Sequence, residues 1–291
     1  MATTSSADAK GLLARAAGVV GQVLVPLGAV TGVLYYFGYV RERALYAYFG
    51  VPVGTLDLTT TDYVLRSTQA IFTPLASLLV VTLVVVLAHQ LVLGRAAARH
   101  PAWWRRATVA TAVVALVLLA LGVAALARLP PLQPVAGALS LGAGAALLEY
   151  AVWMLAADEK VPEPVRATLH QGRFLRGGVL AAVVLLALFW WTANVANSNG
   201  LATARAIEGS LVVRSEAVVL STRPLAVSGY GVEVERLPPG AGFHFRHTGL
   251  RVLAHTGERW ILLPVGWRRD NGAVLVLLPE QEDGVRVDVR P

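Results

Sequence analysis

The stretch VAGALSLGAGAALLEYAVWMLAA, Val135–Ala157, decides how the rest of the chain is arranged. At about 1.5 Å per helical residue it is long enough to cross a hydrocarbon core of about 30 Å. It is also rich in Gly and Ala and carries Glu149, and a mid-span charge opposes insertion by about 2.5 to 3.5 kcal/mol. Ala138, Gly142 and Ala146 recur every four residues, with Glu149 three residues later, so we expect this face to point at other helices. If the stretch crosses a membrane, it sets the side on which the C-terminal part lies.

Composition indicates a membrane protein. Hydrophobic residues make up 56% of the chain and charged residues only 15%, against about 25% in soluble globular proteins. The net charge of +7 comes from scattered basic residues that form no stripe, which argues against nucleic acid as a partner. The chain has no Cys, which excludes disulfides, thiol catalysis and thiolate metal sites.

The order of apolar and alternating segments predicts an α-helical transmembrane bundle of five spans followed by a small all-β domain. We expect a disordered polar tail over residues 1–16 and a five-span transmembrane domain over 17–197. The expected spans are 17–40, 70–93, 107–126, 135–157 and 177–195, followed by a linker over 198–209 and the β domain over 210–291.

The distribution of basic residues predicts the orientation. With the N-terminus in the cytoplasm, the cytoplasmic segments hold ten Lys and Arg residues (2 + 4 + 4) and the outer loops hold four (3 + 1). Cytoplasmic loops carry the excess of positive charge in membrane proteins. We therefore expect a cytoplasmic N-terminus and an extracytoplasmic β domain.

The segment Arg41–Thr68 has two interpretations. Its end, TLDLTTTDYVLRS, offers Thr60 or Thr61 as the N-cap of the next helix. It is either a packed cap that joins two spans or a recognition surface. The side chains that would form that surface are Asp57, Asp62, Tyr63 and Arg66.

Aromatic and basic residues gather at the predicted span ends. Indole rings favour the headgroup layer, and guanidinium groups are attracted to anionic lipids. We expect interfacial anchoring there; in the loop before the third span, which also holds Arg95, Arg99 and His100, a specific phosphate site is the alternative. The anchors are Trp103, Trp104, Arg105, Arg106, Trp190 and Trp191.

The C-terminal part changes to short β-branched or alternating runs, such as EAVVL, VEVE and VRVDV, separated by turn signals such as SGYG and RDNG. Six or seven short strands in about 80 residues predict a small barrel or sandwich. From Arg205 onward eleven Arg face ten acidic residues, so this part has no electrostatic reason to bind nucleic acid.

Glu149 is the strongest single candidate for a functional residue, because an ionisable group inside a membrane is costly unless it is paired or neutralised. Counted from the cytoplasmic ends of their spans, Glu149 and His89 differ in depth by about 6 Å. They are therefore predicted to form a buried polar pair that relays protons or gates a pathway. The alternative is that Glu149 only joins helices by hydrogen bonds.

Enzyme and metal chemistry find little support. No nucleophile elbow, Walker loop, zincin helix or dinucleotide turn occurs in the sequence. His244 and His247 would point to opposite faces of a strand, and no acidic cluster joins them and His255. We expect no cofactor, no metal site and no catalytic residue.

At TTTDYVLRS (Thr59–Ser67) and LLPVGWRRDNG (Leu262–Gly272) the chain resembles multi-pass membrane proteins of actinobacteria. The resemblance implies the same layout of spans followed by a β tail, in a bacterial plasma membrane. It implies no catalytic residue, because no activity is assigned to those proteins.

Two classes of function fit these observations. The first is a binding, scaffold or sensor protein that presents the β domain outside the cytoplasm. The alternative is a subunit of a channel or transporter that uses Glu149 as a buried polar site. The expected partners are the lipid bilayer and either a second copy of the chain or another membrane protein.

Overall fold

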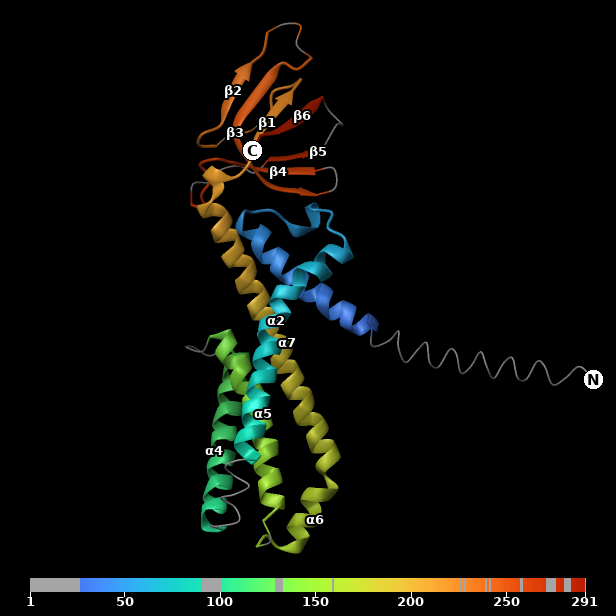
Figure 1. The fold of residues 1–291 in the computed structure, drawn as a ribbon, viewed down its shortest axis with the longest axis vertical. Helices are drawn as coiled ribbons and strands as arrows, with labels where there is room; N and C mark the ends of the chain where they lie inside the picture. The colour runs from blue at the N-terminus through green and yellow to red at the C-terminus, as the bar shows by residue number, and fades with distance from the viewer. Residues whose placement is uncertain are drawn as a thin grey trace, which may run out of the picture. The chain divides into compact units, whose positions relative to one another are not determined.

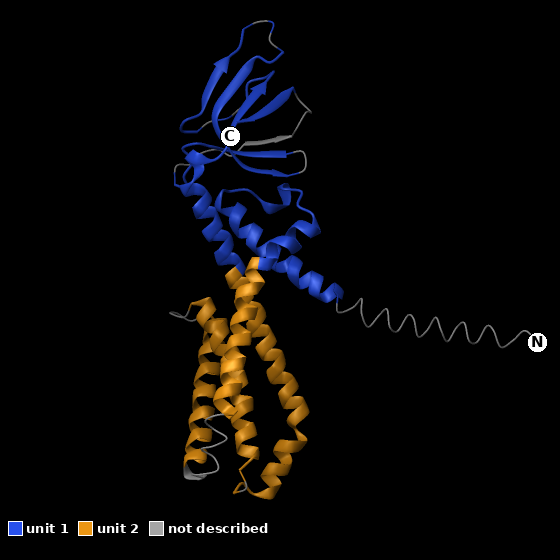
Figure 2. Ribbon diagram, viewed as in Figure 1, with its two compact units in different colours: residues 1–68, 196–291 blue, residues 69–195 orange. Residues whose placement is uncertain are grey.

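A computed structural model describes residues 27–90, 101–128, 133–158, 160–225, 227, 229–238, 240, 242–256, 259–270, 276–279 and 284–290. The chain divides into two compact units (Figure 2). We call residues 69–195 the helical unit, and residues 1–68 with 196–291 the sheet unit. The expected tail over 1–16 and the first part of the first span lie outside the described residues.

The chain is mostly helical and ends in a small antiparallel sheet (Figure 1). Within the described residues four helices are long and apolar enough to cross a membrane, and they correspond to the second to fifth predicted spans. The first predicted span is described only from residue 27, as a helix over 27–48. The other helices are α2 (Thr60–Ala88), α4 (Pro101–Leu126), α5 (Pro134–Ala156), α6 (Glu163–Gln171) and α7 (Arg173–Gly209).

The stretch that decides the fold forms α5, the most buried of the four apolar helices. A third of its apolar window is buried, compared with 11 to 17% for the others. Glycines allow this packing on α4: a Cβ at Gly144 would lie 2.8 Å from the backbone N of Leu119, and one at Gly137 2.3 Å from the Cβ of Ala125. Small residues let helix backbones approach closely where lipid offers no hydrophobic drive. The low hydropathy of α5 is therefore offset by contacts with its neighbour.

Residues 198–209, which we expected to be a linker, are helical and form the last turns of α7. They continue the helix because Ala204 and Ile207, three residues apart, lie on one helical face that packs into the core of the sheet unit. The predicted span ended before the polar residues around Asn197, whereas the helix continues to Gly209.

Six strands form one antiparallel sheet (Figure 1). The strand order is β5-β4-β3-β1-β6, and β2 pairs with the first part of β3. The change of partner from β2 to β4 along β3 occurs at Gly249, whose φ of +75° suits glycine and where a Cβ would lie 1.8 Å from the carbonyl O of Gly231. The strands are β1 (Glu216–Ser221), β2 (Glu233–Arg236), β3 (Phe245–Thr256), β4 (Arg259–Pro264), β5 (Val276–Pro279) and β6 (Val285–Arg290).

Both faces of this sheet carry buried side chains. The predicted barrel or sandwich did not include the helices that pack on one face. Ile261 and Leu263 of β4 pack into a core shared with helices of the sheet unit. Leu262, which alternates with them, packs into a second core with Val219 and Leu250. Because successive residues of a strand point to opposite faces, β4 has a buried residue on each side.

The first of these cores joins segments that are far apart in the sequence. It contains Leu45 from the first described helix, Phe49 from the turn that follows it, Ala204 from α7 and Trp267 from the loop after β4. The ring of Trp267 lies 4.8 Å from that of Phe49, centroid to centroid. The segment after the first predicted span is thus a packed cap, and it packs on the sheet.

Candidate functional site

The helix over residues 27–48 has two halves with different surroundings. Most residues over 27–36 are exposed although they are apolar or aromatic, whereas burial starts at Phe37. Two glycines fix the packed half. A Cβ at Gly38 would lie 1.9 Å from the carbonyl O of Tyr63 in α2, and one at Gly200 of α7 would lie 2.3 Å from that of Arg41. This half is therefore clamped between the beginning of α2 and the end of α7.

A buried ionic cluster reinforces the clamp. The Glu42 carboxylate is fully buried and accepts hydrogen bonds from Arg41 of its own helix and from Arg66 Nη1 of α2, the latter at 2.7 Å. Tyr46 lies beside it, and burial, followed by the negative charge of Glu42, raises the pKa of the Tyr46 phenol. A buried carboxylate between two guanidinium groups holds two helices in one register.

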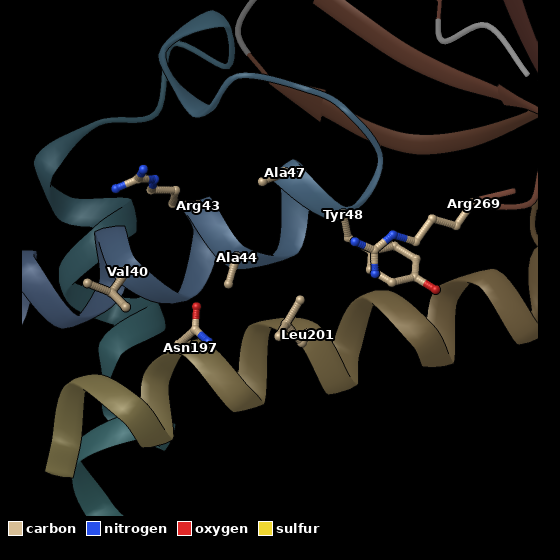
Figure 3. Close-up of a pocket in the computed structure, with 8 residues that line it drawn as sticks. All are labelled: Val40, Arg43, Ala44, Ala47, Tyr48, Asn197, Leu201 and Arg269. Carbon is tan, nitrogen blue, oxygen red and sulfur yellow. The ribbon is translucent and has the colours of Figure 1, made fainter. Parts of the chain in front are cut away.

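A groove of about 340 Å³ runs along the packed half of the helix, opposite the end of α7 (Figure 3). Ala44 and Ala47 leave room between the helices, and Asn197 and Leu201 line the α7 side. Arg43 lies at one end and Arg269 at the other (Figure 3). The full lining is Val40, Arg43, Ala44, Ala47, Tyr48, Asn197, Leu201 and Arg269.

Tyr48 and Glu208 hold Arg269 in place. The guanidinium carbon of Arg269 lies 5.0 Å from the centre of the Tyr48 ring, and its backbone N–H donates to Glu208 Oε1 at 3.4 Å. The Tyr48 hydroxyl donates to the other oxygen of Glu208, and this hydrogen bond raises the pKa of the Tyr48 phenol. Both Arg43 and Arg269 are exposed. The Arg269 guanidinium lies over Tyr48 at one end of the groove, whereas the Arg43 side chain leaves the other end and extends away from the α7 side (Figure 3).

The four residues of the candidate outer-loop surface have separate roles. Asp62 accepts hydrogen bonds from the N–H of Thr59 at 2.9 Å and from its hydroxyl at 2.7 Å, and Thr59 Oγ1 accepts from the Asp62 N–H at 3.2 Å. The N-cap is therefore Thr59, directly before the two predicted candidates, Thr60 and Thr61. Tyr63 is buried, with its ring 5.0 Å from that of Tyr35.

The other two residues of this candidate surface form ion pairs. Arg66 binds Glu42, and Asp57 lies 3.6 Å from Arg259 of β4. These contacts support the packed-cap interpretation of the segment.

Glu149 and His89 have different partners from the one predicted. Glu149 accepts two hydrogen bonds from Arg176 of α7, at 2.9 and 3.2 Å. His89 Nδ1 lies 2.7 Å from the hydroxyl of Tyr150. Within the described part of the helical unit no hydrogen bond joins Glu149 to His89, because Glu149 faces Arg176 of α7 whereas the next residue, Tyr150, about 100° further around α5, faces His89. Their similar depth along the spans predicted that the two side chains were close. The direction in which Glu149 leaves the axis of α5 turns it away from His89.

The predicted anchors split into two groups. Trp103, Arg105 and Arg106 are exposed at the start of α4, as an anchoring role requires. Trp104 instead donates from its indole N–H to the carbonyl O of Met154 at 3.4 Å. The preceding Arg95, Arg99 and His100 lie outside the described residues.

The second pair of anchors faces other helices. The Trp190 ring would lie 3.1 Å from a Cβ at Gly137 of α5. Trp191 lines an apolar cavity of about 330 Å³ between α2, α5 and α7, together with Ala138, Gly142 and Ala146. The face of α5 that carries Ala138, Gly142 and Ala146 thus borders a cavity. The close contact of α5 with α4 uses Gly137 and Gly144 instead.

The three histidines of the sheet unit lie at separate places. His247 is fully buried in β3, with Nε2 3.3 Å from Ser221 Oγ. Burial lowers the pKa of the His247 imidazole. His244 Nδ1 lies 3.0 Å from the carbonyl O of Thr222, and the ring of His255 stacks on Trp260 at 4.0 Å.

Sequence reasoning did not find the groove. Arg43 and Arg269 come from segments 226 positions apart (269 − 43), and Asn197 stood out only as the end of a span. The available signal was the spacing of Val40, Ala44 and Ala47, which places small residues on one helical face.

A scan against protein-family models and searches of curated proteins and of solved structures give no significant match. The functional interpretation therefore depends on the geometry of the chain itself.

Proposed function

We propose that the protein is a membrane-anchored binding or sensor protein, in which the sheet and the helix segments beside it act as one rigid binding body. The observation that carries this proposal is the shared core of Leu45, Phe49, Ala204 and Trp267 with β4. Full burial of one large apolar side chain contributes about 1.5 to 3 kcal/mol. Several such side chains in one core oppose any movement of the sheet against these helix segments.

This arrangement suits transmission of a binding event. The same helix segments that line the groove continue toward the predicted first and fifth spans. A ligand or partner that shifts the sheet therefore also shifts the segments that leave it. We propose the extracytoplasmic side for the sheet unit and the cytoplasm for the N-terminus, supported by the ten-to-four distribution of basic residues.

The alternative function, a channel or transporter subunit, has weaker support. It depends on Glu149 as a buried polar site, and Glu149 is in a bidentate ion pair with Arg176. Such a pair fits a structural joint between α5 and α7. The cavity between α2, α5 and α7 is lined mainly by apolar side chains, which suits no polar substrate.

The sheet offers surface for a protein partner. Tyr230 is 82% exposed and Val234 is 52% exposed. Exposed aromatic and apolar side chains are enriched in binding surfaces. The partner is either a second copy of the chain or another membrane or envelope protein.

Site-specific photo-crosslinking in living cells tests the proposal. A photoreactive amino acid is placed at Tyr230 or at Val234 in the full chain, and Leu79 of α2, an exposed candidate lipid-facing position, is the control. We expect one discrete protein adduct from the sheet positions and none from Leu79. The absence of a discrete adduct from both sheet positions, at normal expression, would contradict the proposal.

A further inference from the structure

We infer that the groove between the first described helix and α7 binds the phosphate group of a membrane lipid. This inference deepens the proposed function and rests on it, because it names the ligand class that the binding body would sense. It requires that the groove lie at the depth of lipid headgroups, carry unpaired positive charge, and have room for the glycerol and the first methylenes of a lipid.

The position of the groove along the chain gives its depth. It begins at Val40, where the first predicted span ends, and at Asn197, two residues after the end of the fifth. Arg43 lies about 4.5 Å further along its helix. The headgroup layer extends about 5 to 7 Å on each side of the hydrocarbon core. From the predicted ends of the first and fifth spans, Arg43 and Asn197 are expected to lie in the headgroup layer, where lipid phosphates are.

The charge of the groove favours an anion. Elsewhere in the sheet unit arginines meet carboxylates, as Arg66 does with Glu42 and Arg259 with Asp57. Among the ion pairs between described residues, neither Arg43 nor Arg269 has a carboxylate partner. At the Arg269 end, Glu208 accepts the Tyr48 hydroxyl and the Arg269 backbone N–H.

The groove is also partly preorganised. The cation–π contact with Tyr48 restrains the Arg269 guanidinium, so less side-chain entropy is lost when it binds an oxyanion. The Asn197 side chain in the wall of the groove adds an amide donor. Val40 and Leu201 add apolar surface beside these polar groups, which suits a lipid better than free phosphate.

General attraction of interfacial arginines to anionic lipids is the competing explanation, and it makes a different prediction. Under that explanation every exposed arginine at this level contributes alike. Arg268 provides the matched comparison, because it is exposed, adjacent to Arg269 and outside the groove lining. The same charge is removed by Arg268→Gln and by Arg269→Gln.

Native mass spectrometry of the full-length protein in detergent, titrated with dioleoyl phosphatidylglycerol, tests the inference. We expect one tightly bound lipid, whose apparent affinity falls about tenfold in Arg269→Gln and less than twofold in Arg268→Gln. Arg269→Lys, which keeps the charge but loses the planar stack, should fall between. Equal melting temperatures show that the variants are folded.

Two further probes separate the parts of the ligand. Dioleoylglycerol, which lacks phosphate, should not displace the bound lipid, and glycerol 3-phosphate, which lacks acyl chains, should compete only at concentrations far above that of the lipid. Equal losses in Arg268→Gln and Arg269→Gln, or displacement by dioleoylglycerol, would overturn the phosphate site. Binding of glycerol 3-phosphate as tight as that of the lipid would overturn the lipid assignment. These results use purified protein alone, so they can fail while the crosslinks from the sheet still form.

Discussion

Glu42 is fully buried between the guanidinium groups of Arg41 and Arg66. Removal of one member of a buried ion pair leaves the others without a counter-charge, which is costlier than the pair's net contribution to stability. The Arg66 side chain is 36% exposed and can still reach water, which reduces the cost. The cluster therefore acts mainly to fix how the first described helix meets α2.

The Glu42→Ala variant should lower the free energy of unfolding by about 3 kcal/mol. Its melting temperature in detergent should fall by about 6 °C or more. The control is Glu163→Ala, which breaks the exposed pair with Arg166 in α6 and should change stability by less than about 1 kcal/mol. Equal shifts in the two variants would show that burial of Glu42 carries no extra cost.

His247 predicts a pH dependence for the sheet unit. Burial lowers its pKa in the folded state below the value near 6.5 of an exposed histidine, so the unfolded chain takes up a proton first as the pH falls. The contribution of neutral His247 to stability is therefore complete above about pH 6.5 and is lost progressively below it.

Thermal melting at pH 7.5 and at pH 5.5 measures this effect. The loss of stability between the two pH values should be smaller in His247→Leu than in the unaltered protein. His244→Leu is the control at an exposed histidine and should keep the full loss. An unchanged pH dependence in His247→Leu would assign the effect to another group.

At the scale of elements, the helix over residues 27–48 is held by close backbone contact. Gly200→Ala should destabilise the protein, because its new Cβ would lie 2.3 Å from the Arg41 carbonyl O and 2.9 Å from the Ala44 Cβ. Gly178→Ala in the same helix meets no atom within 4 Å and should be neutral or stabilising by up to about 1 kcal/mol. The melting temperatures of the two variants in detergent, compared with that of the unaltered protein, show whether each substitution stabilises or destabilises the protein. A neutral Gly200→Ala would mean that the helices separate at little cost.

Element types were largely predictable from the sequence, because long apolar runs and period-two strands are strong local signals. Element ends were less predictable. The N-cap of α2 was predicted at Thr60 or Thr61 and lies at Thr59, whereas residues 198–209 were predicted to be a linker and are the last turns of α7. The groove was not predictable, since its residues come together only when Trp267 and the helices share a core.

At the scale of the whole molecule, the lack of Cys makes topology directly measurable. Single cysteines at Val213 in the sheet unit and at Ala167 in α6 are both at exposed positions. In intact cells a membrane-impermeant maleimide should label Val213→Cys, and should label Ala167→Cys only after permeabilisation. The reverse pattern would place the sheet in the cytoplasm and contradict the distribution of basic charge.

The shared core also determines which fragments of the chain can be produced in soluble form. A cut at residue 210, where strands replace helices, would expose Leu253, Ile261 and Trp267 to water. An apolar surface of that kind promotes aggregation. A fragment that replaces residues 69–195 with a short flexible peptide, and so retains 41–68 together with 196–291, keeps the partners of those side chains. Immunisation or ligand screening with the water-soluble portion should therefore begin from that spliced chain.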